Sequence, residues 1–148
     1  MTQHWHCKPY NELSLDELYG CLQIRSEVFV VGQTCVYQDM DDRDQQAWHL
    51  FGMIDDKIIA YARLLPPGIA YPDAISMGRV LTHPDFRGQG LGKSLTAKAL
   101  EFLAETFPKA HLKISAQAYL QKFYEGFGFV AQGDLYDEDG IPHILMVK

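Results

Sequence analysis

The sequence predicts a mixed α/β fold, in which helices cover the faces of one sheet. Short apolar runs bounded by turn residues, typical of strands, alternate along the chain with segments that carry apolar residues at helical spacing. A glycine-rich loop, DFRGQGLGKS at residues 85–94, joins one of those strands to a helix. At 148 residues the chain has the size of one domain, so we expect a single domain over residues 1–148.

The first half of the chain predicts a strand, a helix and a hairpin. The segment HWHCKPY near the start predicts the strand, and Ser14 is a good N-cap for the helix that follows. The apolar side of that helix is expected to carry Leu15, Leu18, Tyr19 and Leu22. A second helical or turn segment is expected through residues 26–33. Two apolar runs, residues 49–54 and 57–65, predict the hairpin, which a Pro-Pro-Gly sequence ends.

The second half predicts the remaining elements. Residues 74–83 form a strand that ends at Pro84, and the glycine-rich loop then opens a helix, which Pro108 ends. The apolar stripe of this helix comprises Leu91, Leu95, Ala99, Phe102 and Leu103. The last elements are a strand, a short helix and two strands, over residues 112–116, 118–126, 129–136 and 143–147. The turn sequence DEDGIP separates the final two strands.

The composition excludes several classes of function. The formal net charge of −6 offers no broad basic surface for nucleic acid or an anionic membrane. The chain has 3 cysteines without C-x-x-C spacing, which suggests neither a disulfide framework nor a zinc site. No apolar run approaches the ~18 residues of a membrane-spanning helix, and the N-terminus lacks an apolar signal segment. We therefore expect a soluble, cytoplasmic protein that binds neither nucleic acid nor a membrane.

Two short segments are rich in residues that could bind a ligand: one is acidic, and the other carries histidine and cysteine. The sequence QDMDDRD, residues 38–44, is either a solvated loop rich in capping residues or an acidic lip that attracts a cationic amine. His4 and His6 share one face of the first predicted strand, with Cys7 beside them, but no fourth ligand has suitable spacing. We predict no metal site.

The glycine-rich loop suggests a phosphate site, because glycines let backbone N–H groups approach an anion at a helix N-terminus. A Walker loop would need a glycine where Arg87 stands. The two-residue step of Gly88, Gly90 and Gly92 does not match a dinucleotide fingerprint either. A plain turn between a strand and a helix stays open. Arg87 favours a pyrophosphate instead, because a guanidinium beside exposed amides suits that group.

A second motif, AQAYLQKFYEGFGF at residues 116–129, follows the loop. Together with RVLTHPDF at residues 79–86 and Arg87-x-x-Gly90-x-Gly92, it resembles the GNAT superfamily of acyl-CoA-dependent N-acyltransferases. Residues 25–44, followed by a histidine, further resemble the ElaA-like branch, except that Gly32 stands where that branch usually has glutamate. The resemblance covers nearly the whole chain. It implies a mostly antiparallel central sheet flanked by helices on both faces, and acetyl-CoA (coenzyme A) as the source of the pyrophosphate.

The same resemblance implies the site residues. Backbone groups of Val80, Leu81 and Thr82 would align the pantetheine arm and the thioester carbonyl. The pyrophosphate would be held by Arg87, Gly88, Gln89, Gly90, Gly92 and Lys93. Gln117 stands where many relatives have an asparagine that contacts the cofactor. Tyr124 stands where relatives have the tyrosine that protonates the departing thiolate, although Leu120, Tyr124 and Phe127 share a helix face that would also suit a core residue.

The general base is left open. The candidates, acting directly or through water, are Glu27, His49, His83, Asp85 and His143. No acidic residue lies between Leu112 and Ala116, where some relatives carry a catalytic glutamate.

These observations predict an acetyl-CoA-dependent N-acetyltransferase. The acceptor would be a primary amine on a small molecule or peptide, which attacks the thioester directly in a ternary complex, and two copies of the chain could form a homodimer. One alternative is a coenzyme A-binding sensor or regulatory module without turnover. Another is a non-enzymatic partner-binding domain, in which the glycine-rich loop is only a turn.

Overall fold

The computed structural model describes residues 3–148 and contains a seven-stranded sheet in the order β1-β2-β3-β4-β5-β7-β6. The strands are β1 (His4–Pro9), β2 (Trp48–Ile54), β3 (Lys57–Leu65), β4 (Ala74–Thr82), β5 (His111–Gln117), β6 (Val130–Glu138) and β7 (Ile141–Val147). The helices are α1 (Leu15–Arg25), which continues into a π-helical turn η2 (Ser26–Val31), α2 (Leu91–Thr106) and α3 (Gln121–Glu125). The 3-10 turns are η1 (Tyr10–Glu12), η3 (Asp44–Gln46), η4 (Pro84–Phe86) and η5 (Ala118–Leu120).

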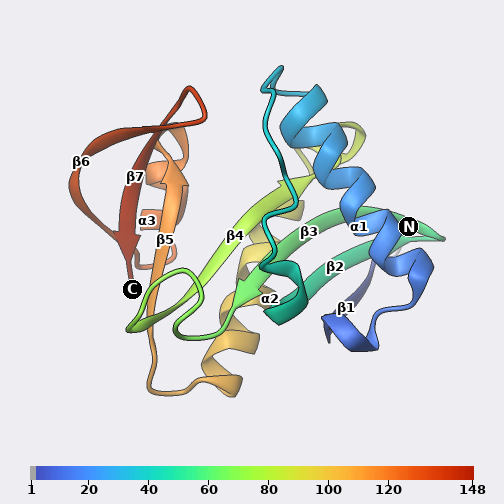
Figure 1. The fold of residues 1–148 in the computed structure, drawn as a ribbon, viewed down its shortest axis with the longest axis horizontal. Coiled ribbons are helices and arrows are strands. Elements are labelled where there is room, and N and C mark those ends of the chain that lie inside the picture. Colours follow the sequence, from blue (N-terminus) through green and yellow to red (C-terminus); the bar gives the residue numbers. More distant parts are fainter. Residues whose placement is uncertain (1–2) are drawn as a thin grey trace.

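The predicted mixed, mostly antiparallel α/β fold is confirmed, since only β4 and β5 pair in parallel. Figure 1 shows α1 in front of β2 and β3, and α2 and α3 behind the sheet. On the α1 face, Cys21 and Ile24 pack with Phe51 and Tyr61. The predicted stripe of α2 is buried on the other face, apart from the partly buried Phe102. Within residues 3–148, no helix is long and apolar enough to cross a membrane.

The sheet divides between β4 and β5. These strands pair only near their starts, Ala74 with His111 and Ile75 with Leu112. Beyond those two pairs they diverge, as Figure 1 shows. The second half of each strand therefore leaves backbone N–H and C=O groups on the facing edge without a sheet partner, which is where a ligand can bind them. Residues 80–82 and Gln117 lie at these diverging ends.

Helix α1 begins as predicted but buries a different face. The side chain of Ser14 accepts a hydrogen bond from the Glu17 amide, and the Glu17 carboxylate accepts one from the Ser14 amide, which is a capping box. However, Leu15 is 86% exposed and Tyr19 is 71% exposed, so their predicted burial is wrong. The buried face includes Arg25, which is fully enclosed. Apolar spacing missed that face because one of its three buried residues, Arg25, is charged.

The connection between β6 and β7 is also shorter than predicted. The ladder extends to the pair Glu138 and Ile141, so the turn consists of Asp139 and Gly140 alone. Both have positive φ, 54° and 81°, as a two-residue hairpin turn requires. Most of the predicted loop DEDGIP is therefore strand, and Tyr136 and Glu138 point to the same face of the sheet.

Candidate active site

The acyl-donor side is shaped by a bulge in β4. Arg63 pairs with Gly78 and Tyr61 with Leu81, so one residue of β3 faces two residues of β4, Arg79 and Val80. Arg79 has a φ of 50°, which is unusual for a residue other than glycine. Bulges bend a strand and redirect the groups that follow. This bulge includes Val80, so it lies at the start of residues 80–82, where β4 diverges from β5.

The glycine-rich loop has an open anion-binding geometry. Gly88 and Gly90 have φ values of 81° and 75°, and a Cβ atom placed on either would meet no protein atom within 4 Å. Gly90 is the N-cap of α2, where no side chain caps the helix and no acidic residue lies in the first turn. The first amides of a helix have no partner within it. Arg87 and Lys93 are exposed beside these amides. The loop therefore offers a pyrophosphate both positive charge and open backbone N–H groups.

Tyr124 lies in the apolar cluster on the α2 face, which Val80 also contacts. Its ring is edge-on to Phe123 and Phe129, with centroid distances of 5.2 and 5.6 Å. Burial, together with the nearby Tyr119, raises the pKa of Tyr124 to about 12, so the phenol keeps its proton at neutral pH. The ring is therefore part of the core, as the alternative interpretation expected. Burial of the ring does not test whether the Tyr124 hydroxyl gives its proton to the thiolate, so that role stays a prediction. Gln117 is half-buried at the end of β5.

For three of the four aspartates in residues 38–44 neither interpretation holds, because their carboxylates are paired with arginines rather than solvated or free on an acidic lip. Asp39, Asp41 and Asp44 pair with Arg25, Arg63 and Arg79 to form what we call the arginine–aspartate cluster. The nitrogen–oxygen distances of these five ion pairs are 2.7 to 2.9 Å. Asp39 and Asp44 are buried, and only Asp42 of the four aspartates is exposed.

The pairing controls the charge of the cluster. Burial alone would raise the pKa of Asp41, but the hydrogen bonds and charge of Arg63 lower it to about 2. For Asp44, Arg25 and Arg63 likewise outweigh burial and lower the pKa. Asp44, which is buried, therefore needs its arginines, since a buried charge without a partner is costly.

Of the five candidate bases, His49 and His83 are engaged in hydrogen bonds within the fold, whereas Asp85, on η4, has an exposed carboxylate. His49 is buried, and its ring nitrogens lie 2.7 Å from the Tyr61 hydroxyl and 2.9 Å from the Asp44 carbonyl oxygen. Burial lowers the pKa of His49. His83 Nδ1 accepts a hydrogen bond from the amide of Asp85, which caps the turn η4. Glu27 is exposed on η2.

The fifth candidate, His143, belongs to a polar network that sequence reasoning missed. His143 on β7 lies 3.2 Å, Nε2 to Oε2, from Glu138 on β6. The Glu138 Oε1 atom accepts a hydrogen bond from Ser115 Oγ on β5 at 3.3 Å, and Ser115 also bonds the Tyr136 hydroxyl. The rings of Tyr136 and His143 stack with centroids 6.1 Å apart. We call Ser115, Tyr136, Glu138 and His143 the Glu138 network.

This network faces the same side of the sheet as α1. Ile114, Ala116 and Ile144 point into the α2-side core, so the alternate residues Ser115 and His143 point to the other face. On that side a cavity of about 390 Å³ separates residues 33–36, after η2, from residues 139–141 of the β6–β7 turn. Cys35 Sγ donates a hydrogen bond to the Asp139 carbonyl oxygen at 3.2 Å across it.

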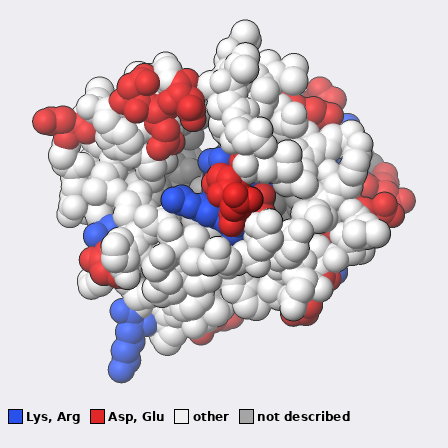
Figure 2. Space-filling view, viewed as in Figure 1, with Lys and Arg blue, Asp and Glu red and all other residues white. Residues whose placement is uncertain are grey.

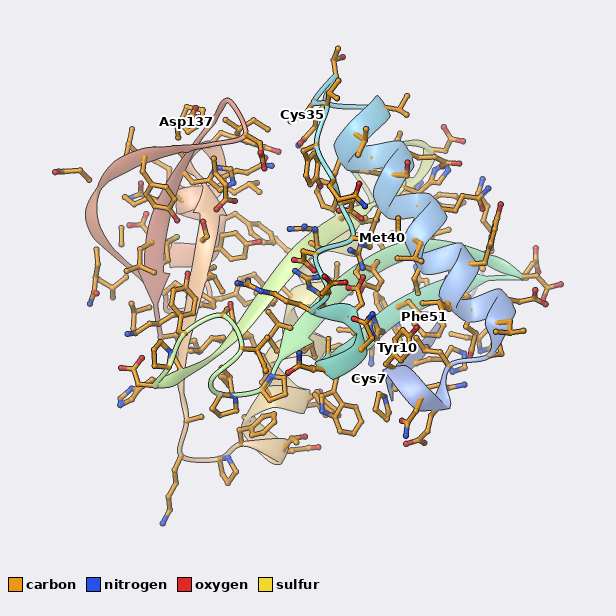
Figure 3. The ribbon with its side chains drawn as sticks, viewed as in Figure 1. Cys7, Tyr10, Cys35, Met40, Phe51 and Asp137 are labelled. Atoms are coloured by element: carbon orange, nitrogen blue, oxygen red, sulfur yellow. The ribbon has the colours of Figure 1, made fainter. Side chains whose placement is uncertain are left out.

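The figures show this opening. Figure 2 shows a hollow between the acidic end of β6 and β7, at upper left, and the segment after α1, with basic side chains beside it. In Figure 3, Asp137 and Cys35 lie on its two sides, and Met40 lies on the strand-like segment that descends toward the centre of the molecule. Among residues 3–148, no group of three or more His, Cys, Asp and Glu side chains is arranged to hold a metal ion.

Comparisons with known proteins place this geometry in context. Residues 12–148 match the family model described as an acetyltransferase (GNAT) domain. The chain is 44% identical to a UPF0039 protein of Synechocystis sp., over 99% of this chain and 96% of the relative. It is 40% identical to protein ElaA of Escherichia coli, over 97% and 95% of the two chains.

Solved structures agree. The crystal structure of an acyl-CoA N-acyltransferase from Pseudomonas aeruginosa superposes with a TM-score of 0.95 at 42% identity, covering 99% of both chains. A CoA-dependent acyl-homoserine lactone synthase superposes with a TM-score of 0.81 at 16% identity. The match covers 99% of this chain and 82% of the synthase, and at this identity it shows a shared fold alone.

Proposed function

Because the chain belongs to the GNAT acyltransferase family, in its ElaA-like branch, we propose that it moves an acetyl group from acetyl-CoA to a primary amine in a ternary complex. The family supplies acyl transfer from a coenzyme A thioester. The acetyl donor, the amine acceptor and the direct attack are our proposal. The observation that carries it is the divergence of β4 and β5 beside an uncapped, glycine-rich helix N-terminus.

The donor would lie along this opening. The pyrophosphate would bind the amides of residues 88–93, with Arg87 and Lys93 adding positive charge. The pantetheine arm would continue between β4 and β5, where the edge groups of residues 80–82 and Gln117 have no ladder partners on the opposite strand. The same backbone N–H groups would stabilise the oxyanion that develops on the thioester carbonyl.

Tyr124 would then protonate the departing thiolate. A pKa of about 12 lies above the ~8.5 of a simple thiol, which taken alone disfavours the transfer. Burial, however, makes a thiolate more basic as well. In this protein burial raises the pKa of both Cys7 and Cys21 to about 12. A thiolate that forms in the same apolar surroundings as Tyr124 would be similarly basic, so the two pKa values would match.

The acceptor would enter from the α1 face, through the cavity between residues 33–36 and 139–141. The donor and the acceptor would then meet at the diverging ends of β4 and β5 from different directions. Such an arrangement suits direct attack, because both substrates can be bound at once.

An amine panel tests the proposal. The purified protein is incubated with acetyl-CoA and with alkylamines, amino acids, polyamines, amino sugars and peptides, while free thiol is measured. We expect amine-dependent thiol release. Binding of acetyl-CoA without release by any amine would favour the sensor alternative. Absence of acetyl-CoA binding would contradict both. Longer acyl-CoA donors in parallel test the preference for acetyl.

A further inference from the structure

We propose that Glu138 and His143 act together as the base that takes the proton from the acceptor amine. This inference rests on the proposed function and adds the residues that complete its chemistry. Both side chains belong to the Glu138 network on the α1 face of β5, β6 and β7.

The hydrogen bonds define where a proton can go. His143 Nδ1 lies 2.7 Å from the carbonyl oxygen of Ile141, which can only accept, so Nδ1 carries a proton and donates it. In the neutral imidazole this leaves a lone pair on Nε2, which points at Glu138 Oε2, 3.2 Å away. Two acceptors at this distance attract one another only when a proton lies between them. The pair is therefore arranged to receive one proton and share it.

Burial gives the two residues different tasks. The side chain of Glu138 is 49% exposed and that of His143 is 7% exposed. Glu138 can therefore touch an incoming ammonium group, and His143 accepts the proton behind it. Ser115 holds the other carboxylate oxygen, and the Tyr136 ring covers one side of the imidazole, so both groups are oriented before the substrate arrives.

The pair also lies at the correct end of the sheet. His143 is directly opposite Gln117, the last residue of β5, in the β5–β7 ladder. Glu138 directly precedes the β6–β7 turn, and the turn residues Asp139 and Gly140 line the acceptor cavity together with Ile141. The base would thus lie between the entrance and the thioester.

Groups on neighbouring segments face the same space. Burial raises the pKa of Tyr71, in the β3–β4 connection, and Tyr136 and Glu138 raise it further. Arg43 acts on Tyr71 in the opposite direction. Tyr71 is therefore close enough to Glu138 to respond to its charge, and two cations lie near Tyr71: Arg43, and Lys113 on β5, whose Nζ is 5.9 Å from the centroid of the Tyr71 ring.

The proton balance is complete without another reactant. The ammonium gives one proton to the pair, which releases it to solvent through the exposed carboxylate. The free amine attacks, the N–C bond forms and the C–S bond breaks. Tyr124 gives its proton to the thiolate. The nitrogen loses a proton as the amide forms, and that proton returns Tyr124 to its neutral form. The products are the amide, the thiol and one proton in solvent.

The test uses Glu138→Gln, which keeps the size of the side chain but can neither take the proton nor, without its negative charge, stabilise it on His143. Asp134→Asn is the matched control, since Asp134 is an exposed acidic residue on the same strand. With an alkylamine acceptor found in the panel, we expect kcat of Glu138→Gln to fall by roughly 10²–10⁴-fold near neutral pH. Asp134→Asn should stay at wild-type activity, and both variants should keep the acetyl-CoA-induced shift in melting temperature.

The pH dependence separates a base from a positioning residue. Without the pair, the variant depends on amine already deprotonated by solvent. That fraction grows about tenfold per pH unit up to the alkylamine pKa of ~10.4, so the deficit should shrink as the pH rises. Wild-type turnover in Glu138→Gln, or a deficit that is constant with pH, would overturn the inference while leaving the proposed function standing. His143→Gln should reproduce the same pH dependence if it remains folded. A wild-type protein that binds acetyl-CoA but acetylates no amine would overturn both.

Discussion

Arg79 donates a hydrogen bond from Nε to the Oδ1 atom of Asp39 at 2.8 Å. This contact joins the β4 bulge, which Arg79 and Val80 form, to the segment that follows η2. The other carboxylate oxygen of Asp39 accepts a hydrogen bond from the buried Arg25 at 2.9 Å. One carboxylate thus connects α1 to the strand where the thioester is proposed to bind.

Asp39→Asn should therefore destabilise the fold strongly. The amide keeps the shape of the side chain but leaves the fully buried Arg25 with one carboxylate fewer. We expect a loss of about 3 kcal/mol in the free energy of unfolding, measured by urea denaturation. Asp42→Asn is the control, because Asp42 is exposed and has a φ of 65° that asparagine tolerates. Equal stability of the two variants would contradict the buried role.

Acid should destabilise the protein through the same cluster. The pKa of Asp41 in the fold is about 2, below its unfolded value of ~3.9. A lowered carboxylate pKa contributes stability that is fully present above the unfolded value and is lost as the pH falls through the folded one. The free energy of unfolding should fall between about pH 4 and pH 2. The decline should be shallower in Asp41→Asn. An unchanged slope would show that Asp41 is not paired in solution.

Gly90→Val should abolish acetyl-CoA binding. The side chain would enter the open space where the pyrophosphate is proposed to lie, and valine is strained at a φ of 75°. In the wild type, acetyl-CoA at a hundredfold excess over Kd should add ~2.7 kcal/mol of stability, seen as a raised melting temperature. Gly133→Val is the matched control, with a φ of 77° and the same open space on β6. Only the Gly90 variant should lose the shift.

Tyr124→Phe should separate catalysis from packing. The ring and its edge-on contacts remain, so the stability loss should not exceed ~1 kcal/mol. We expect kcat to fall by roughly 10²–10⁴-fold with an unchanged Kd for acetyl-CoA. The loss should shrink for acyl donors with a more acidic thiol. Tyr119→Phe, at a neighbouring position that is 76% exposed, should keep full activity. Full turnover in folded Tyr124→Phe would exclude Tyr124 as the acid.

Local rules explain what could be predicted. The N-cap at Ser14, the end of β4 shortly before Pro84 and the start of α2 after Gly90 each depend on residues close together in the sequence. The fold class followed from the order of such elements, together with the family resemblance. Most of the residues proposed to bind the donor lie in one stretch, residues 80–93, and Gln117 and Tyr124 belong to one further motif, so short motifs were enough to nominate them.

The acceptor side could not be predicted in this way. Arg25 meets Asp44 across 19 residues of sequence, and Arg79 meets Asp39 across 40. Ser115 and Glu138, 23 residues apart, become neighbours only because β5, β7 and β6 pair in that order. An aspartate looks the same in the sequence whether its carboxylate is hydrated at the surface or paired with a buried arginine.

The sequence by itself determined the family, the order of strands and helices, and the loop proposed to bind a pyrophosphate, because propensity, capping and glycine conformation act over short distances. Only the tertiary structure decided which charges are buried, which face of α1 packs on the sheet, and which of five candidate bases lies beside a cavity. Those outcomes depend on the pairing register and the desolvation of groups distant in sequence, and a buried charge is tolerated only where the fold brings its partner within hydrogen-bonding distance.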